Sequence, residues 1–186
     1  MIWLDVVHFH GMSQQTLARA RALFCALAVF GFCSILHGGA KAKEPAPKFN
    51  ATTTTGEKFS NDSIKGKVVL LEFWTTWCGY CAEEAPLVDE ISKEYADRGL
   101  IVLAVNVGES KKKVKKYLEQ HPRASKIVLM DDTNLAAMYQ ATVYPIYVVI
   151  DKDGNIAGTQ HGAGGEGRLR RLLARGGIGD DDNSDH

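Results

Sequence analysis

The chain has 186 residues, 45% of them hydrophobic, and its 22 Lys and Arg residues balance its 22 Asp and Glu residues. This length fits one domain of ~100–150 residues with additional segments, and the apolar content suffices for a folded core. The balanced charge gives no reason to expect nucleic acid or an anionic surface as a partner, and four cysteines are too few for a disulfide-stapled scaffold.

Residues 1–42 have the features of a signal peptide or an N-terminal membrane anchor. Two arginines precede the uncharged run 23–36, and an Ala-x-Ala candidate cleavage site follows at 40–42. The run is shorter than the ~20 residues that cross a bilayer, which favours a cleaved signal peptide over an anchor. A start at Met12 would give a more typical signal, so residues 1–11 are interpreted as a misassigned start. Either form predicts an extracytoplasmic, periplasmic protein.

The four cysteines form two groups with different expected fates. Cys25 and Cys33 lie inside the N-terminal apolar run, so cleavage would remove them. Cys78 and Cys81 would then be the remaining cysteines. A pair three residues apart closes almost no loop, so it is not a structural staple. Outside the cytoplasm, such a pair is expected to be a disulfide or a redox centre.

Residues 43–48 contain two prolines and are expected to be a linker into a domain at 49–175, and the acidic, Gly-rich tail at 176–186 is expected to be disordered. Buried strands that alternate with helices predict an α/β domain with a mixed sheet covered on both faces. The expected elements, in order, are a β-hairpin at 49–60, a strand at 67–73, a helix at 83–95, a strand at 100–107, a helix with a solvated lysine face at 109–120, a strand at 127–130, a short helix at 134–140, two antiparallel strands at 146–150 and 156–161, and a helix at 166–175.

The cysteine pair lies where the buried strand 67–73 turns into the following helix. The N-terminus of a helix presents unpaired N–H groups and the positive end of the helix dipole, so it stabilises a thiolate. Residues three apart on a first helical turn are neighbours. Cys78 and Cys81 are therefore expected to form and release a disulfide without a large backbone movement.

These residues resemble the thioredoxin superfamily, and within it the extracytoplasmic TlpA/ResA/CcmG-type thiol–disulfide oxidoreductases. The resemblance covers roughly residues 45–175 and rests on four segments: Phe-Trp-Thr-Thr-Trp-Cys-Gly-Tyr-Cys at 73–81, Glu-Ala-Pro at 84–86, Tyr144-Pro145, and Val-Ile-Asp-Lys-Asp-Gly at 149–154. It implies a thioredoxin fold, here a central mixed β-sheet flanked by helices with an extra N-terminal β-hairpin. It also implies a cis peptide bond before Pro145.

The resemblance assigns roles to the residues around the pair. Cys78 is expected to be the exposed nucleophile, and Cys81, one turn deeper, the resolving thiol. The backbone at the cis-proline is expected to dock a substrate's extended chain. The residues expected to contact substrate are Trp77, Gly79, Tyr80, Tyr144 and Pro145.

Two carboxylates are candidates for the site. Glu72 lies in the central strand, where the resemblance implies a buried proton acceptor for Cys81. The alternative is that Glu72 only pairs with a lysine, such as Lys58 or Lys67. Glu84 is a candidate site carboxylate by resemblance to ResA-like proteins, and the alternative is an acid in the first helical turn that favours the dipole.

The resemblance implies an enzyme that reduces disulfides of envelope proteins such as apocytochromes c and is recharged by a membrane thiol–disulfide partner. The Gly79-Tyr80 dipeptide lacks the proline of thioredoxin, which would favour a more oxidising, oxidase- or isomerase-like role. A non-catalytic metallochaperone on the same scaffold is the remaining alternative, in which His161 could assist the thiols. We expect no cofactor, no resident metal and a monomer.

Overall fold

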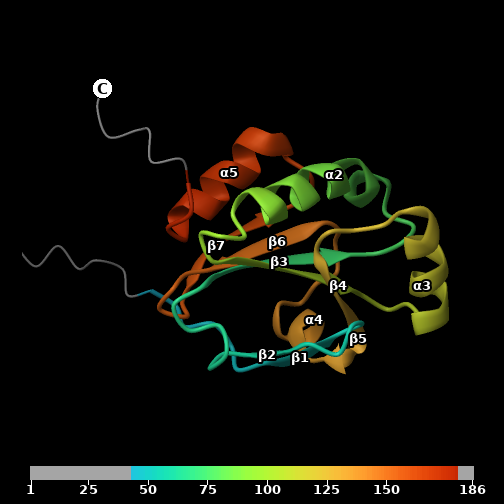
Figure 1. Cartoon of the computed structure of the whole chain (residues 1–186), viewed down its shortest axis with the longest axis horizontal. Helices are drawn as coiled ribbons and strands as arrows, with labels where there is room; N and C mark the ends of the chain where they lie inside the picture. The colour runs from blue at the N-terminus through green and yellow to red at the C-terminus, as the bar shows by residue number, and fades with distance from the viewer. Residues whose placement is uncertain (1–42, 180–186) are drawn as a thin grey trace, which may run out of the picture. The chain divides into compact units, whose positions relative to one another are not determined.

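The computed structural model describes residues 43–179, so the predictions for 1–42 and for 180–186 lie outside the described residues. This part of the chain forms a seven-stranded mixed sheet with strand order β2-β1-β5-β4-β3-β6-β7 (Figure 1). The strands are β1 (Asn50–Thr53), β2 (Lys58–Ser60), β3 (Val68–Trp74), β4 (Leu100–Asn106), β5 (Lys126–Thr133), β6 (Ile146–Ile150) and β7 (Ile156–His161). The helices are α2 (Gly79–Glu94), α3 (Lys111–Gln120), α4 (Leu135–Met138) and α5 (Gly165–Arg175).

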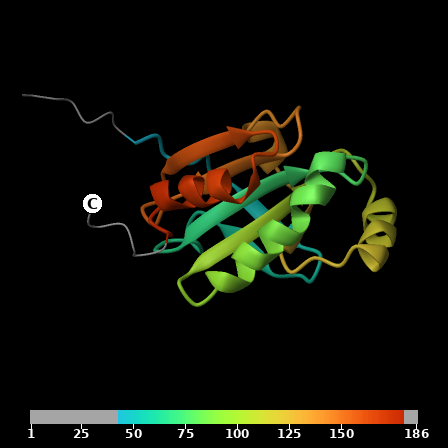
Figure 2. The ribbon, with the colours of Figure 1, turned by 90° about the horizontal axis from the view of Figure 1, so that it is seen from above.

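Helices cover both faces of the sheet, which confirms the predicted α/β thioredoxin fold. Helices α2 and α5 lie side by side over one face (Figures 1 and 2), where Val88, Ile91 and Leu169 pack on Leu70 and Val149. The short helix α4 covers the opposite face (Figure 1). Burial of apolar side chains on both faces supplies the main driving force for this arrangement.

Strand β3 is an interior strand of the sheet, between β4 and β6, and all seven of its residues are buried. It pairs parallel with β4 and antiparallel with β6, so neighbours saturate both of its edges. Its continuous apolar sequence is typical of a strand that packs on both faces. The exception in this run is Glu72, which pairs in register with Ala104 of β4 and Tyr147 of β6.

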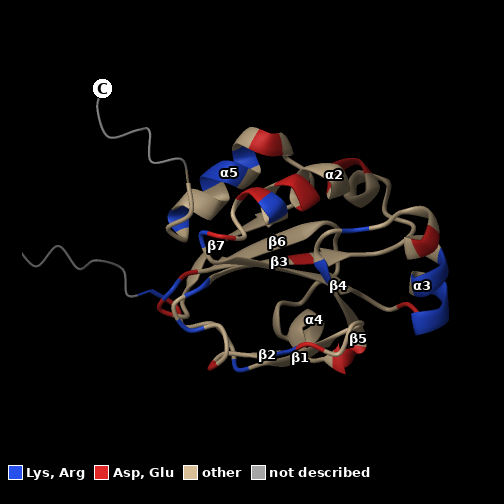
Figure 3. Cartoon of the chain, in the orientation of Figure 1, with Lys and Arg blue, Asp and Glu red and all other residues tan. Residues whose placement is uncertain are grey.

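Helix α3 lies beyond one end of the central strands, beside the start of α2 (Figure 1). Its Val114 is buried against Trp74 and the cysteine pair, whereas its lysines are exposed on the outer side (Figure 3). Ser110 caps the helix by accepting a hydrogen bond from the Lys113 backbone N–H. The helix therefore contributes one apolar stripe to the site and a solvated lysine face.

Residues 43–48 belong to the domain, so their prediction as a linker is wrong. The Ala46 N–H donates to the Gly154 carbonyl at 2.9 Å, and the Ile156 N–H donates to the Glu44 carbonyl at 2.7 Å. Lys43 pairs with Asp151 at 2.8 Å. The segment lies along the turn between β6 and β7, where its backbone groups find partners that a linker would leave to water.

The described start of the C-terminal tail is also part of the domain, which corrects the boundary predicted at 175. Ile178 is only 2% exposed and packs in the core beneath α5. Its N–H donates to the Leu173 carbonyl at 3.2 Å. One apolar side chain among glycines is enough to hold this segment, although the composition favours disorder.

Several element boundaries differ from the predictions. Helix α2 begins at Gly79 rather than at 83, strand β5 is longer than predicted, and α4 is shorter. Strand β1 pairs antiparallel with β2 on one side and with β5 on the other. Among residues 43–179, no helix combines the length and apolar character needed to cross a membrane.

Candidate active site

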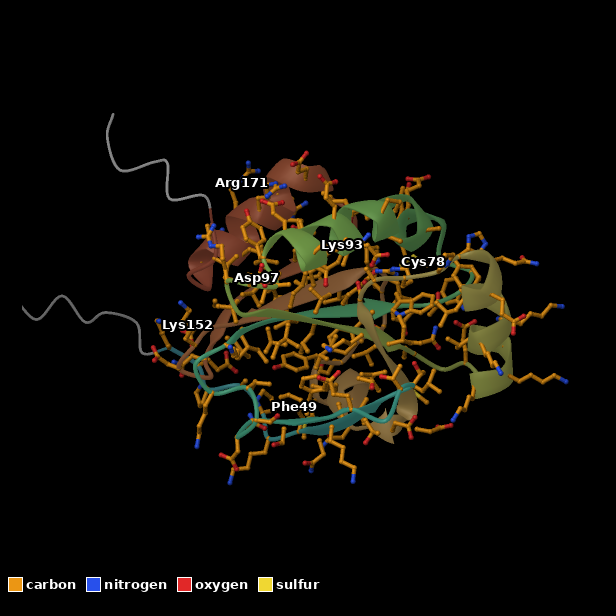
Figure 4. All side chains as sticks on the ribbon, in the orientation of Figure 1. Phe49, Cys78, Lys93, Asp97, Lys152 and Arg171 are labelled. Carbon is orange, nitrogen blue, oxygen red and sulfur yellow. A yellow bond between two sulfur atoms is a disulfide. The ribbon has the colours of Figure 1, made fainter. Side chains whose placement is uncertain are left out.

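The cysteine pair lies at the N-terminus of α2, directly after the loop that follows β3. Cys78 is the N-cap residue of the helix, and its Sγ accepts a hydrogen bond from the Cys81 backbone N–H at 3.1 Å. The two sulfurs form a disulfide, with the Cα atoms 5.3 Å apart. Figure 4 shows Cys78 at the end of α2 nearer α3, with Lys93 toward the other end. A thiolate released at Cys78 would face the helix N-terminus, which favours its charge.

The two cysteines differ less in exposure than the sequence predicted. Cys78 is 7% exposed and Cys81 is 1% exposed. The expectation of an exposed Cys78 is therefore wrong for the disulfide form, in which its sulfur is bonded to Cys81 and packs near Trp74. Cys78 remains the more exposed residue of the pair.

The loop before Cys78 is held by Glu109, which follows β4 and was not singled out from the sequence. Its carboxylate accepts hydrogen bonds from the Thr76 N–H and hydroxyl, both at 2.6 Å, and from Asn106 at 2.8 Å, and it pairs with Lys113 at 2.6 Å. Burial raises the pKa of Glu109, but these donors outweigh burial and lower it to about 2. The Glu109 carboxylate thus fixes the loop at Thr76, just before the cysteine pair.

An exposed aromatic and apolar surface surrounds the cysteine pair. Trp77 is 67% exposed, Tyr80 is 65% exposed, and Val143, which the sequence analysis missed, is 59% exposed. The Trp77 ring meets the Tyr144 ring edge-on, with centroids 5.8 Å apart. The Tyr144–Pro145 peptide bond is cis. Large exposed apolar side chains that gather in one place typically mark an interaction surface.

Glu72 lies under α2 and is fully buried. Its Oε2 accepts a hydrogen bond from Arg123 at 2.7 Å, and its Oε1 has no hydrogen-bond partner among the described residues. The prediction that Glu72 pairs with Lys58 or Lys67 is wrong, because Arg123 makes the ion pair with Glu72. Burial raises the pKa of Glu72, and the nearby guanidinium opposes that rise without cancelling it.

Arg123 also contacts helix α2, so Glu72, Arg123 and Asp89 form one charged cluster. Its side chain is 4% exposed, and its Nε donates to Asp89 at 3.1 Å. The same Asp89 oxygen accepts hydrogen bonds from the Ser125 N–H at 3.1 Å and from the Ser125 hydroxyl at 2.7 Å. The guanidinium also lies over the Trp74 ring, 5.8 Å from its centroid. Arg123 comes from an irregular segment, so no periodicity in the sequence points to it.

Glu84 lies in the second turn of α2, so it is not the first-turn acid considered as an alternative. It is 7% exposed. One oxygen accepts the Gly164 and Gly165 N–H groups at 2.8 and 2.6 Å, and the other accepts the Tyr147 hydroxyl at 2.8 Å. The same glycine loop reaches the cis-proline, since the Gly162 N–H donates to the Pro145 carbonyl at 2.8 Å. Glu84 thus ties the cysteine helix to the loop that supports the cis-proline.

The arrangement provides the parts needed for thiol–disulfide exchange: two paired sulfurs, a helix N-terminus, a buried carboxylate and an apolar rim. Within residues 43–179, no group of three or more His, Cys, Asp and Glu side chains is arranged to hold a metal ion.

Comparisons with known proteins agree with this geometry. The Redoxin family model matches residues 41–173. The thioredoxin-like protein YneN of Bacillus subtilis is 38% identical over 121 residues, which cover 63% of this chain and 70% of YneN. The thiol–disulfide oxidoreductase ResA of Bacillus subtilis is 31% identical over 136 residues, which cover 72% of this chain and 76% of ResA.

Solved structures show the same fold. A thiol:disulfide interchange protein of the thioredoxin family from Chlorobium tepidum superimposes with a TM-score of 0.65 at 27% identity. The match covers 74% of this chain and 99% of the Chlorobium protein.

Proposed function

We propose that this chain exchanges disulfides with other proteins outside the cytoplasm. The proposal proceeds from its family, because the chain belongs to the Redoxin family and is a thioredoxin-like thiol–disulfide oxidoreductase. The observation that carries this proposal is the Cys78–Cys81 disulfide at the N-terminus of α2. The sulfur pair itself carries the electrons, so no further cofactor is required, and one chain holds the complete site.

In the reductive direction, the Cys78 thiolate attacks a substrate disulfide, bonds to one substrate sulfur and releases the other as a thiolate. Cys81 then gives up its proton and attacks the Cys78 sulfur. The second substrate thiolate leaves and takes up a proton, and the Cys78–Cys81 disulfide forms. Two electrons pass from the enzyme to the substrate, and the reverse sequence oxidises a substrate dithiol.

Glu72 is the proposed proton acceptor for Cys81. Successive side chains of a strand point to opposite faces, so Glu72 points to the same face of β3 as Trp74. Trp74 packs with both cysteines in one buried cluster. The second oxygen of Glu72 has no partner in the described part of the chain, so it is available to a proton.

The proposed docking surface comprises the exposed side chains around the disulfide and the backbone before the cis-proline. An extended substrate segment would lie along Tyr144 and Pro145, with its apolar side chains against Trp77 and Tyr80. Gly79 borders open space, since a Cβ there would meet no atom within 4 Å outside its two chain neighbours. Glu84 supports this surface from below through the glycine loop.

The proposed direction is reduction of envelope proteins such as apocytochromes c, with a membrane thiol–disulfide partner that restores the dithiol. The resemblance to ResA-type proteins implies this direction, and the match to the thiol–disulfide oxidoreductase ResA supports disulfide exchange itself. The Gly79-Tyr80 dipeptide favours the second candidate, a more oxidising oxidase- or isomerase-like role. Independently of the dipeptide, the Cys81 N–H points at the Cys78 sulfur, and a donor in this position stabilises the thiolate and hence the reduced form.

A trapping experiment tests the proposal. Cys81→Ser should leave Cys78 able to form mixed disulfides with substrate proteins that are then not resolved. Cys78→Ser is the matched control, because it keeps one cysteine at the site and should trap nothing. The adducts trapped by Cys81→Ser should disappear when the sample is treated with a reducing agent, because they are mixed disulfides. If both variants trap proteins equally, or neither does, the assignment of nucleophile and resolving thiol is wrong.

A further inference from the structure

Arg123 lies beneath α2 in a charged cluster with Glu72 and Asp89. Arg123 is nearly inaccessible and contacts Glu72 and Asp89 at the same time. No other Lys or Arg in the range 43–179 makes an ion pair with Glu72. The guanidinium is therefore the positive charge on which the buried Glu72 carboxylate depends.

The other titratable groups that face Glu72 do not favour its ionised form. Glu84 and Asp89 of α2 are acids, and each raises the pKa of Glu72 through its own charge. From β6, Tyr147 lies opposite Glu72 in register, but its hydroxyl donates to Glu84. From β4, the partner in register is the apolar Ala104. Arg123 is the one group of this set that opposes burial.

A buried carboxylate without a cation neutralises by taking up a proton, because the charged form is strongly disfavoured in an apolar interior. A protonated Glu72 cannot accept the proton of the resolving thiol. Arg123 contacts Oε2 and leaves Oε1 without a partner among the described residues. The ion pair thus offsets part of the cost of burying the charge, while one oxygen remains free.

We propose that Arg123 is a positioning residue that keeps Glu72 ionised, with its second oxygen free to receive the Cys81 proton. The proposal rests on the proposed function of Glu72. In the resolving step, the Cys81 S–H bond breaks, its proton goes to Glu72, and its sulfur bonds to Cys78 as the substrate thiolate leaves. Arg123 touches neither sulfur and acts only through Glu72.

The surroundings of Arg123 fit this role. It lines an open groove of about 820 Å³ between α2 and the end of α3, together with Asp89, while its Nη2 contacts Glu72. Asp89 and the Trp74 ring fix the guanidinium from two further sides. The arginine therefore separates the buried acceptor from solvent, and its own orientation does not depend on Glu72 alone.

The test is the pH profile of disulfide reduction by the pre-reduced full chain, with a synthetic peptide disulfide as the probe. Arg123→Met should shift the acid limb of the rate to higher pH by about one unit or more, which lowers the rate on that limb at least about tenfold. The sign follows because loss of the cation raises the pKa of Glu72, so a higher pH is needed to ionise it. Arg123→Lys keeps the charge and should retain most of the original profile.

Arg170→Met is the matched control, because Arg170 also pairs with two carboxylates, Glu94 and Glu166, but on the surface of α5. It should leave the pH profile unchanged. Infrared difference spectra should show a protonated buried carboxyl at neutral pH in Arg123→Met and not in Arg170→Met. A merely structural role of Arg123 would lower stability without moving either readout, and that result would overturn the proposal.

A double variant guards against a poorly folded single variant and separates the two proposals. Glu72→Gln with Arg123→Met should reduce the peptide disulfide within about twofold of Glu72→Gln alone, since Arg123 acts only through Glu72. A further tenfold loss in the double variant would overturn the inference about Arg123. If Glu72→Gln alone leaves the wild-type profile unchanged, the proton-acceptor role of Glu72 itself fails.

Discussion

Replacement of Glu84 by alanine should be strongly destabilising although it removes a charged residue from the interior. The carboxylate is the acceptor for three donors, the N–H groups of Gly164 and Gly165 and the hydroxyl of Tyr147. A buried donor left without an acceptor costs about 1–3 kcal/mol. Because the variant also no longer buries a carboxylate, part of this cost is recovered, and we expect a net loss of about 3–5 kcal/mol.

Urea denaturation of the oxidised protein at neutral pH measures this loss as a shift of the midpoint at unchanged slope. Glu83→Ala is the control, because Glu83 is the exposed neighbour on the same helix and should change the free energy of unfolding by less than about 0.5 kcal/mol. Glu84→Gln should lie between the two, since its amide still offers one acceptor. A loss for Glu84→Ala of below about 1 kcal/mol would show that the three hydrogen bonds do not hold the glycine loop.

Three further predictions concern the loop before the cysteines, the tail and the docking surface. The pKa of Glu109 is lowered to about 2, so the stability it contributes is present above the pKa of the unfolded chain, near 4.5, and is lost as pH falls toward 2. Glu109→Gln should therefore be less stable than wild type near neutral pH, and the two urea midpoints should converge in acid; a constant difference would contradict the ion-pair account. Ile178→Ala should cost about 2–4 kcal/mol in the free energy of unfolding; a cost below about 0.5 kcal/mol would show that Ile178 is not a core residue. Trp77→Ala should slow exchange with protein disulfides but not with a small dithiol reagent, because the ring is exposed and offers contact area rather than chemistry; equal slowing with both would refute a docking role.

Local sequence patterns were sufficient to predict the sheet and the place of the cysteine pair. The apolar run of β3 and the switch to helical spacing after Cys81 are properties of neighbouring residues, so they can be read without tertiary structure. The prediction of a buried acid at Glu72 followed from the same run, since a charge in a continuous apolar strand is exceptional.

The partners of the buried acids could not be predicted in this way. Arg123 and Glu109 lie in irregular segments, and their contacts with Glu72 and Thr76 span 51 and 33 residues of sequence. The suggested partners Lys58 and Lys67 lie nearer to Glu72 in the sequence than Arg123 does. The contact instead depends on how the segment after α3 returns across the end of the sheet.

Composition was a poor guide at both ends of the domain. The prolines near Ala46 suggested a linker, and the glycines near Ile178 suggested disorder. Both segments are held by backbone hydrogen bonds and by one small or branched apolar side chain that fills a site on the core. Such an anchor is a single residue with no period, so no sequence pattern reveals it.

The redox equilibrium of the cysteine pair tests the central claim most directly. The protein would be equilibrated with glutathione buffers of graded potential while tryptophan fluorescence is followed, since Trp74 packs with both cysteines and Trp77 lies beside Cys78. We predict one two-electron transition, which Cys78→Ser should abolish. A reduction potential at or below about −250 mV would identify a reductant. A reduction potential of about −120 to −180 mV would identify an oxidant or an isomerase. A dithiol that stays reduced at every potential would contradict the assignment of Cys78 and Cys81 as a redox couple.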